Sequence, residues 1–378
     1  MRICMLNLTS GGMSGGYRTY LSHLVPRLAN HPDVDAMLVG APQSLDISPW
    51  QRAAPSVQWL PLKCSLLNRG GEISRVQKRV IKGFAPDVLF IPTARYWRID
   101  GVPVVTMVRN MIPMMAHNST YCLERIRNWA RFKQLQAAVR KSDRIVAISY
   151  FVKDCLTNGL GIREDKIGVV YHGLERHGNE PGKRPSAIPE DWSGGFVFAA
   201  GLIYPYRGIE DQIEAWHCLR SLPDLPPLVI AGKVGQGMSR YYAKLRRLVH
   251  DRGMEPHIHF VGLLDRPEMV WCYRNCLALV MTSRVEACPN IALEAMAHGC
   301  VCIAAQNPPL PEFFAEAAEY YPPGQPQSLA QAVRLVLDRS SGRCTEMSAR
   351  ALVRASRFSW DVCCDETIRE LRTAVERH

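Results

Sequence analysis

The 378 residues lack several sequence features that would identify a membrane-spanning, secreted or zinc-binding protein. No stretch approaches the roughly 20 consecutive apolar residues of a transmembrane helix. The N-terminus leads directly into an expected strand rather than into a signal peptide. The 13 cysteines include no Cys-x-x-Cys pair, which excludes the usual zinc-binding spacing. We therefore expect a cytoplasmic protein with reduced thiols, whose contact with a membrane is peripheral and on its inner face.

Glycine-rich nucleotide fingerprints are also incomplete. Residues 9–16 read Thr-Ser-Gly-Gly-Met-Ser-Gly-Gly between an apolar segment and a helical one, but Met13 occupies a position where the dinucleotide fingerprint requires glycine. No P-loop sequence occurs elsewhere in the chain. Because glycine has no Cβ, this turn can still bring the backbone close to a ligand. A tight turn without a ligand is the alternative.

The charge of the chain is strongly unbalanced. Lys and Arg number 46 against 35 Asp and Glu, and the net charge of +11 favours anionic partners such as phosphates, nucleic acid or anionic lipid. No aromatic and basic recognition motif accompanies it, so we expect no nucleic-acid partner. A helix predicted over 124–141 concentrates six basic residues: Arg125, Arg127, Arg131, Lys133, Arg140 and Lys141. This helix is either a solvated face or a surface for anionic lipid or a phosphate-bearing acceptor.

Length and element order predict two domains of the α/β class. A chain of 378 residues can bury two separate cores. Apolar segments alternate with helical ones in both halves, which indicates doubly wound parallel sheets. Residues 175–195 are rich in Gly, Pro and charge without apolar periodicity, as in a linker. We expect an N-terminal domain over 1–174, this linker, and a C-terminal domain over 196–378.

The most informative stretch covers residues 276–299. A short, continuously apolar strand over 276–281 leads into a polar loop and then into good helix formers that end at Gly299. Pro289 suits the first helical turn, where its missing N–H costs no hydrogen bond. The loop therefore lies at the carboxyl end of a strand and before a helix N-terminus, where open α/β sheets bind ligands and free amides face anions.

Two carboxylates, Glu286 and Glu294, belong to this loop and helix. Asn290 and Glu294 are one helical turn apart, so both can face one bound molecule. A phosphate at the helix amides and a ribose hydroxyl at a carboxylate would together form a nucleotide site. The alternative is that Glu286 is a solvated loop charge and Glu294 an exposed helix charge.

The spacing Glu286-x7-Glu294, with Pro289-Asn290 between and Glu-Ala-Met-Ala-x-Gly after, closely resembles the signature of the retaining glycosyltransferases of family 4 (group 1). The resemblance implies the GT-B fold, in which two Rossmann-like domains face each other across a cleft and the last helix packs back on the N-terminal domain. It also implies that Glu286 lies beside a donor sugar and that Glu294 hydrogen-bonds the ribose of a nucleotide-sugar.

Other motifs of this family recur in order. Arg207-Gly208 resembles its basic-residue–Gly motif, and the arginine fork can bind a diphosphate bidentately. The family's companion arginine is Leu202 here, so Lys233 is our candidate for a second cation, with a solvated lysine as the alternative. The resemblance also implies donor contacts that fall at these residues: Val261 and Leu263 beside the nucleobase, and Asn290 and Ile291 at the start of the helix.

The N-terminal domain departs from the family at one place. The resemblance puts Gly15 and Gly16 near the donor phosphate and the acceptor. Where the family commonly has a histidine, this chain has Arg109 and Asn110. Arginine stays protonated and an amide has no basic nitrogen, so neither is a general base. Asn110 can hydrogen-bond a sugar hydroxyl and Arg109 can bind a phosphate.

The resemblance implies a hexosyltransferase that moves a sugar, with retention, from a nucleotide diphosphate to a saccharide or lipid-linked acceptor in bacterial polysaccharide or glycolipid assembly. We expect no cofactor and no metal, because cations already serve the diphosphate. Without an identifiable second carboxylate as covalent nucleophile, front-face attack is the default. A nucleotide-sugar epimerase and a catalytically silent nucleotide-sugar-binding partner remain alternatives. UDP, GDP, dTDP and ADP donors all remain open.

Overall fold

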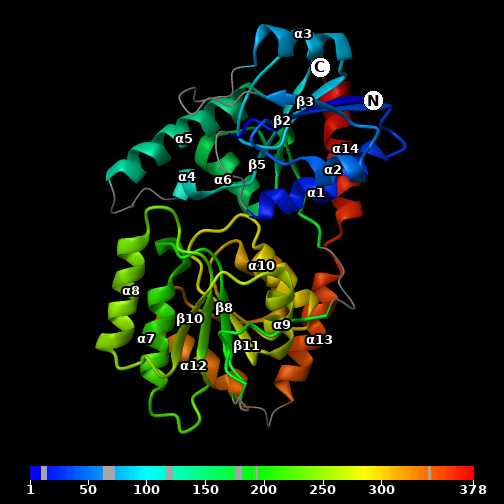
Figure 1. The fold of residues 1–378 in the computed structure, drawn as a ribbon. Coiled ribbons are helices and arrows are strands. Elements are labelled where there is room, and N and C mark those ends of the chain that lie inside the picture. Colours follow the sequence, from blue (N-terminus) through cyan, green and yellow to red (C-terminus); the bar gives the residue numbers. More distant parts are fainter. Residues whose placement is uncertain are drawn as a thin grey trace. The chain divides into compact units, whose positions relative to one another are not determined.

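The computed structural model describes residues 1–9, 15–62, 73–115, 122–174, 181–190, 192, 195–338 and 342–378. Part of the predicted Gly-rich turn and part of the predicted linker lie outside these residues. The chain divides into two compact units: unit 1 comprises Met1–Gly173 and Ser359–His378, and unit 2 comprises Leu174–Phe358 (Figure 1). In the described part of the chain, no helix is both long and apolar enough to cross a membrane.

The described residues of unit 1 form a seven-stranded sheet in the order β3-β2-β1-β4-β5-β6-β7, and every pairing is parallel. The strands are β1 (Arg2–Leu6), β2 (Ala36–Pro42), β3 (Gln58–Leu62), β4 (Val88–Ile91), β5 (Val104–Val108), β6 (Arg144–Ala147) and β7 (Ile167–Val169). All residues of β4 and β5 are buried, as expected where helices cover both faces of a parallel sheet. The strand order reverses between β1 and β4, which makes the carboxyl edge there a ligand-binding position.

Helices surround this sheet (Figure 1). They are α1 (Gly15–Ala29), α2 (Ser48–Ala53), α3 (Arg75–Phe84), α4 (Ile112–Met115), α5 (Cys122–Lys141), α6 (Tyr150–Leu160), the 3₁₀ turn η1 (Glu164–Lys166) and α14 (Trp360–Glu376). The C-terminal helix α14 packs against α1 and against β4, β5 and β6. Glu370 on α14 pairs with Arg144 at 2.5 Å, and a Cβ at Gly168 would lie only 2.0 Å from the Glu370 carboxylate. Glycine at 168 therefore lets the last helix approach the sheet.

The described residues of unit 2 form a second parallel sheet, in the order β10-β9-β8-β11-β12-β13. The strands are β8 (Val197–Ala200), β9 (Leu228–Ala231), β10 (Ile258–Gly262), β11 (Ala278–Met281), β12 (Cys302–Ala305) and β13 (Ala318–Tyr321). Here the order reverses between β8 and β11. The prediction of two doubly wound, Rossmann-like parallel sheets is confirmed.

The helical segments of unit 2 connect these strands: η2 (Pro205–Arg207), α7 (Ile209–Leu219), α8 (Ser239–Asp251), α9 (Arg266–Asn275), α10 (Asn290–Ala297), α11 (Leu310–Phe314), η3 (Ala315–Ala317), α12 (Pro326–Leu337) and α13 (Arg343–Ala355). Pro289 is the N-cap of α10 rather than a residue of its first turn. Helix α11 begins at Leu310, in the proline-rich segment after β12. Pro311 is tolerated there because a proline in the first turn loses no helical hydrogen bond.

Candidate functional site

The carboxyl edge of the unit 2 sheet brings Arg207 and Glu286 together at the β8–β11 reversal. Arg207 ends η2 after β8, and Glu286 lies in the loop after β11. Arg207 Nη1 forms an ion pair with Glu286 Oε1 and also donates a hydrogen bond to Ser283 Oγ at 3.1 Å. The two charged side chains are only 18% and 11% exposed, so water screens the pair weakly.

Hydrogen bonds hold the backbone of Arg207 in place. The Thr282 hydroxyl donates to the carbonyl oxygen of Arg207 at 2.6 Å, and Gln212 Nε2 donates to the same hydroxyl oxygen at 2.8 Å. Gly208 adopts a left-handed φ of 65°, and a Cβ there would lie 2.6 Å from the Thr282 carbonyl oxygen. Position 208 therefore needs glycine both for its conformation and for this close approach.

Two further glycines let the strand ends come together beneath the guanidinium. Gly201 has a φ of 139°, and a Cβ there would lie 3.1 Å from Arg207 Nε. Gly232 has a φ of 153°, and a Cβ there would lie 1.8 Å from the Gly201 carbonyl oxygen. Arg207 Nε is buried against this backbone without a hydrogen-bond partner among the described residues. A cavity of about 20 Å³ lies below, between the β8 and β11 ends and Gln212.

The loop that carries Glu286 is anchored by residues that the sequence did not single out. Arg284 Nη2 donates to both carboxylate oxygens of Asp211 at 3.0 and 3.1 Å, and its backbone N–H donates to the Tyr206 carbonyl oxygen at 2.7 Å. Asn307 Nδ2 donates to the carbonyl oxygens of Ser283 and Arg284 at 3.2 and 2.9 Å. The loop is therefore tied to α7, η2 and the segment after β12.

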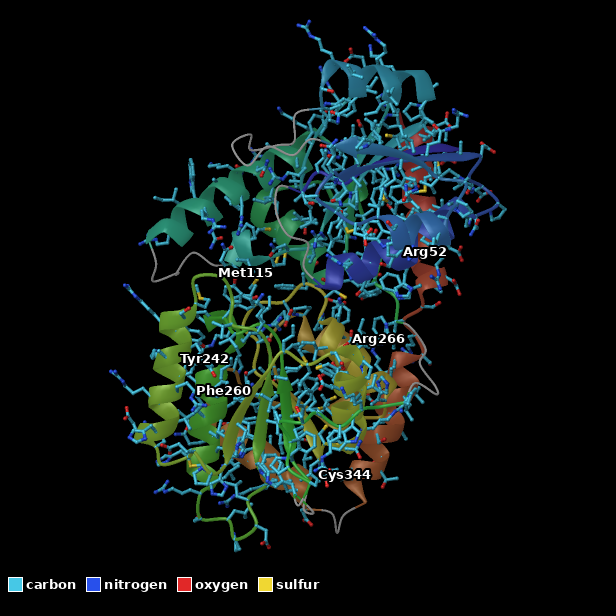
Figure 2. All side chains as sticks on the ribbon, in the orientation of Figure 1. Arg52, Met115, Tyr242, Phe260, Arg266 and Cys344 are labelled. Atoms are coloured by element: carbon cyan, nitrogen blue, oxygen red, sulfur yellow. The ribbon has the colours of Figure 1, made fainter. Side chains whose placement is uncertain are left out.

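Glu294 lies on α10, one turn after Asn290, and its partner is Tyr273. The phenol of Tyr273 on α9 donates to Glu294 Oε2 at 3.0 Å. Burial raises the pKa of the Glu294 carboxyl, while this hydrogen bond and the charge of Arg266 act in the opposite direction. Arg266, labelled in Figure 2, is the first residue of α9. One carboxylate oxygen is thus engaged, and a carboxylate can accept further hydrogen bonds.

The other predicted donor residues lie at the ends of β9 and β10 or in the first turn of α10. Lys233 directly follows Gly232 after β9 and is exposed, and its carbonyl oxygen accepts from the Ile203 N–H at 3.0 Å. Val261 is half-buried and Leu263 is 72% exposed beside the end of β10. Ile291 is a half-buried residue of the first turn of α10. The sheet order therefore lines up these positions with Arg207, while their contact with a ligand stays a prediction.

In unit 1, the predicted acceptor residues lie at the start of α1 and directly after β5. Gly15 and Gly16 are the first two residues of α1, rather than part of the preceding turn. Arg109 follows β5, and its guanidinium lies over the Tyr17 ring, with 3.5 Å between Cζ and the ring centroid. Asn110 is exposed, and its Oδ1 accepts from the Ile112 N–H at 3.0 Å at the start of α4. The side-chain oxygen of Asn110 is therefore already hydrogen-bonded to the backbone at the start of α4.

The described residues contain no group of three or more His, Cys, Asp or Glu side chains arranged to hold a metal ion. The polar groups gathered at the two sheet edges are cations, amides and single carboxylates. Cations and free amides suit phosphate oxygens, and carboxylates suit hydroxyl groups. Both kinds of group occur at the β8–β11 edge of unit 2.

The two halves of the chain match known protein families. Residues 14–177 match the family described as Glycosyltransferase Family 4, and residues 187–353 match the family described as Glycosyl transferases group 1. A D-inositol 3-phosphate glycosyltransferase of Jonesia denitrificans is 32% identical over 173 residues, which cover 44% of this chain and 40% of that protein. The O-antigen chain mannosyltransferase RfbU of Salmonella typhimurium is 22% identical over 203 residues, 53% of this chain and 52% of that protein. The matched segments thus span about half of these relatives' lengths.

A solved structure shares the fold over the whole chain. The crystal structure of Anabaena HepE in complex with UDP and glucose superposes with a TM-score of 0.73 at 19% sequence identity, and the match covers 99% of this chain and 100% of HepE. At this level of identity the likeness shows the fold alone. It confirms the GT-B class predicted from the sequence.

Proposed function

The chain belongs to the glycosyltransferases of family 4 and group 1, and from this membership we propose that it transfers a hexose from a nucleotide diphosphate to an acceptor hydroxyl with retention of anomeric configuration. The relatives named above act in inositol phosphate glycosyl transfer and in O-antigen assembly. The proposed role is accordingly in bacterial polysaccharide or glycolipid assembly, in the cytoplasm or on the inner membrane face.

The ion pair of Arg207 and Glu286 carries this proposal. The donor diphosphate is a stronger and bidentate partner for the guanidinium, so it replaces Glu286 at Arg207 when the donor binds. The released carboxylate then lies beside the sugar, where it can orient hydroxyl groups or stabilise positive charge that develops on the ring. The pair of Arg207 and Glu286 thereby stabilises both the negative charge on the phosphates and the positive charge on the sugar in the transition state.

The rest of the donor site follows the same sheet edge. Lys233 supplies the second cation in place of Leu202, and the amides at Asn290 and Ile291 face the phosphates from the N-terminus of α10. Glu294 accepts hydrogen bonds from the ribose hydroxyls at the lone pairs that Tyr273 does not use. The backbone from 261 to 263 lies beside the nucleobase.

The acceptor binds to unit 1 through Gly15, Gly16, Arg109 and Asn110. Neither Arg109 nor Asn110 is a base, so the departing diphosphate takes the proton of the acceptor hydroxyl. In front-face attack, the anomeric C–O bond to the phosphate breaks on the face where the acceptor oxygen bonds. No cofactor or metal enters this scheme, because Arg207 and Lys233 neutralise the leaving group.

Contact with anionic lipid is the second part of the proposal. Helix α5 exposes Trp129 at 62% and Ile126 at 59% among its basic side chains. An exposed tryptophan flanked by Arg and Lys suits the boundary between head groups and acyl chains. We propose that α5 rests on an anionic membrane and so brings the enzyme to a lipid-linked acceptor.

A catalytically silent nucleotide-sugar-binding partner is the second candidate. Leu202 favours it, because this position is 43% exposed and leaves the phosphates one cation short. Such a protein would bind a nucleotide-sugar without releasing free nucleotide. An epimerase would convert the sugar but would give no glycosylated acceptor.

The test measures thermal stability of the full chain with UDP-, GDP-, dTDP- and ADP-sugars, and then nucleotide release with that donor and a panel of saccharide and lipid-linked acceptors. We expect one nucleotide class to raise the Tm, since a ligand in excess of its Kd stabilises the folded state. Nucleotide release should persist in EDTA. Failure of all four donors to shift the Tm would contradict the proposal, and binding without release would favour the silent partner.

A further inference from the structure

Arg109 is a largely enclosed cation that pairs with no carboxylate among the described residues of unit 1. Its guanidinium lies flat over Tyr17, and its Nε is buried without a hydrogen-bond partner among the described residues. No ion pair joins it to a carboxylate in the described part of unit 1, although exposed arginines of this unit, such as Arg163, have one. The charge is therefore held at the end of β5 without the partner that buried charges normally require.

The surroundings of Arg109 do not neutralise it. Burial lowers the pKa of its guanidinium, because desolvation disfavours the charged form. Burial also raises the pKa of the neighbouring phenols of Tyr17 and Tyr20, so both are neutral at pH 7. The face of the Tyr17 ring attracts the cation, but this contact replaces only part of the hydration that the guanidinium has lost.

A second positive feature lies at the same place. Tyr17 is the third residue of α1, so Arg109 contacts a side chain that the first turn of that helix carries. The N–H groups of a first helical turn have no partner within the helix and carry a partial positive charge. The first turn of α1 contains no acidic residue, and a Cβ at Gly15 would meet no described atom within 4 Å. The Arg109 charge and the helix start therefore both favour an anion at this end of α1.

We propose that unit 1 binds an acceptor bearing an anionic oxygen group, a phosphate or a carboxylate, which Arg109 and the first turn of α1 hold. That the bound molecule is an acceptor rests on the proposed function. That an anion binds here rests on Arg109 and α1 alone. It makes Arg109 the residue that selects charged acceptors over neutral ones. A planar guanidinium can bind either group with two parallel hydrogen bonds.

The experiment measures binding of inorganic phosphate and of acetate to the full chain by calorimetry, at constant ionic strength set with NaCl. The variants are Arg109→Gln, Arg109→Lys and the control Arg98→Gln, which removes the same charge from an exposed side chain of unit 1. Each is made with and without Arg207→Gln, since the unit 2 site can bind phosphate as well. We expect Arg109→Gln to weaken phosphate binding at the unit 1 site at least tenfold. Arg109→Lys should weaken this binding less, and Arg98→Gln should leave it unchanged.

Glycerol 3-phosphate against glycerol, and glucuronate against glucose, then separate a phosphate-bearing acceptor from a carboxylate-bearing one. Hydrogen exchange on the wild-type chain tests the site even if a variant fails to fold. Phosphate should slow amide exchange at residues 15–19 and 108–112. Unchanged phosphate affinity in Arg109→Gln, or protection confined to unit 2, would overturn the proposal. If no nucleotide-sugar binds while phosphate still binds at Arg109, the proposed function fails and this site stands.

Discussion

The Arg207 guanidinium and the Glu286 carboxylate pair directly between the segments that follow β8 and β11. Each residue is therefore the other's partner before a donor arrives. A diphosphate that binds Arg207 must displace Glu286, and displacement costs less when the carboxylate can turn to the hydroxyl groups of the sugar. Donor binding and placement of the carboxylate are thus coupled in one exchange of partners.

Replacement of Glu286 by Gln should affect turnover much more than donor affinity. The amide pairs weakly with Arg207, so the diphosphate gains easier access, while the negative charge beside the sugar is lost. We expect kcat to fall on the order of 10²-fold to 10³-fold, as for removal of one preorganised electrostatic group, with donor Kd unchanged or lower. Glu316→Gln, an exposed carboxylate of the same unit, is the control. Full activity in Glu286→Gln would remove this residue from catalysis.

Arg207→Ala should weaken the binding of nucleoside diphosphates more than the binding of nucleoside monophosphates. In our proposal the guanidinium binds the diphosphate bidentately, so a monophosphate offers it fewer phosphate oxygens. We expect a loss of roughly tenfold to 100-fold for the diphosphate, as for a charge-assisted hydrogen bond of about 1.5–3 kcal/mol. Calorimetry with both nucleotides measures the difference, and Arg240→Ala on α8 is the control. Equal losses would exclude Arg207 from the diphosphate site.

Glu294→Gln should stabilise the free protein at neutral pH while it weakens donor binding. Burial raises the pKa of Glu294 above its value in the unfolded chain, roughly 4.3. Between these two pKa values the folded state binds more protons than the unfolded state, so stability falls as pH rises and the loss is complete above the folded pKa. Urea unfolding should therefore show the variant more stable than wild type at pH 8, with the difference shrinking below pH 4. A variant less stable at pH 8 would contradict an unfavourable buried charge.

Gly232→Ala should destabilise unit 2. The new Cβ would lie 1.8 Å from the Gly201 carbonyl oxygen, at a φ of 153° that alanine rarely adopts. We expect a loss of roughly 3–4 kcal/mol from backbone strain and overpacking together. The control is Gly237→Ala, which has a φ of 78° and no atom within 4 Å of the added Cβ, so it should lose only about 1–2 kcal/mol. Equal losses in thermal unfolding would show that strain alone matters.

The sequence was sufficient for the two sheets, for the positions of Arg207 and Glu286 after strands and for that of Glu294 on the following helix, because local patterns determine those positions. Their partners could not be predicted. The pairing of Arg284 with Asp211 and that of Glu294 with Tyr273 join residues 73 and 21 positions apart. These contacts depend on how α7 lies against the loop after β11 and how α9 lies against α10. Neither Asp211 nor Tyr273 belongs to a pattern visible in the chain.

The same limit applies to Arg109. The sequence predicted a residue that could bind phosphate, but its position over Tyr17 depends on how α1 packs against the end of β5. A lone arginine after a strand is most often a solvated charge. That no described carboxylate of unit 1 pairs with Arg109 could be seen only when the residues around it were placed.

Binding to anionic vesicles should depend on α5. Each Arg or Lys near an anionic surface contributes about 1 kcal/mol, so Arg125→Gln with Arg127→Gln should weaken partitioning about 30-fold. Trp129→Ala should weaken it further by removing the exposed ring. Sedimentation with phosphatidylglycerol vesicles measures both, and added salt should reduce binding because it screens exposed charges. The controls are Arg240→Gln with Arg247→Gln and the exposed Leu352→Ala, all in unit 2. Equal losses in both sets would show that net charge, rather than a face built on α5, determines attraction to the membrane.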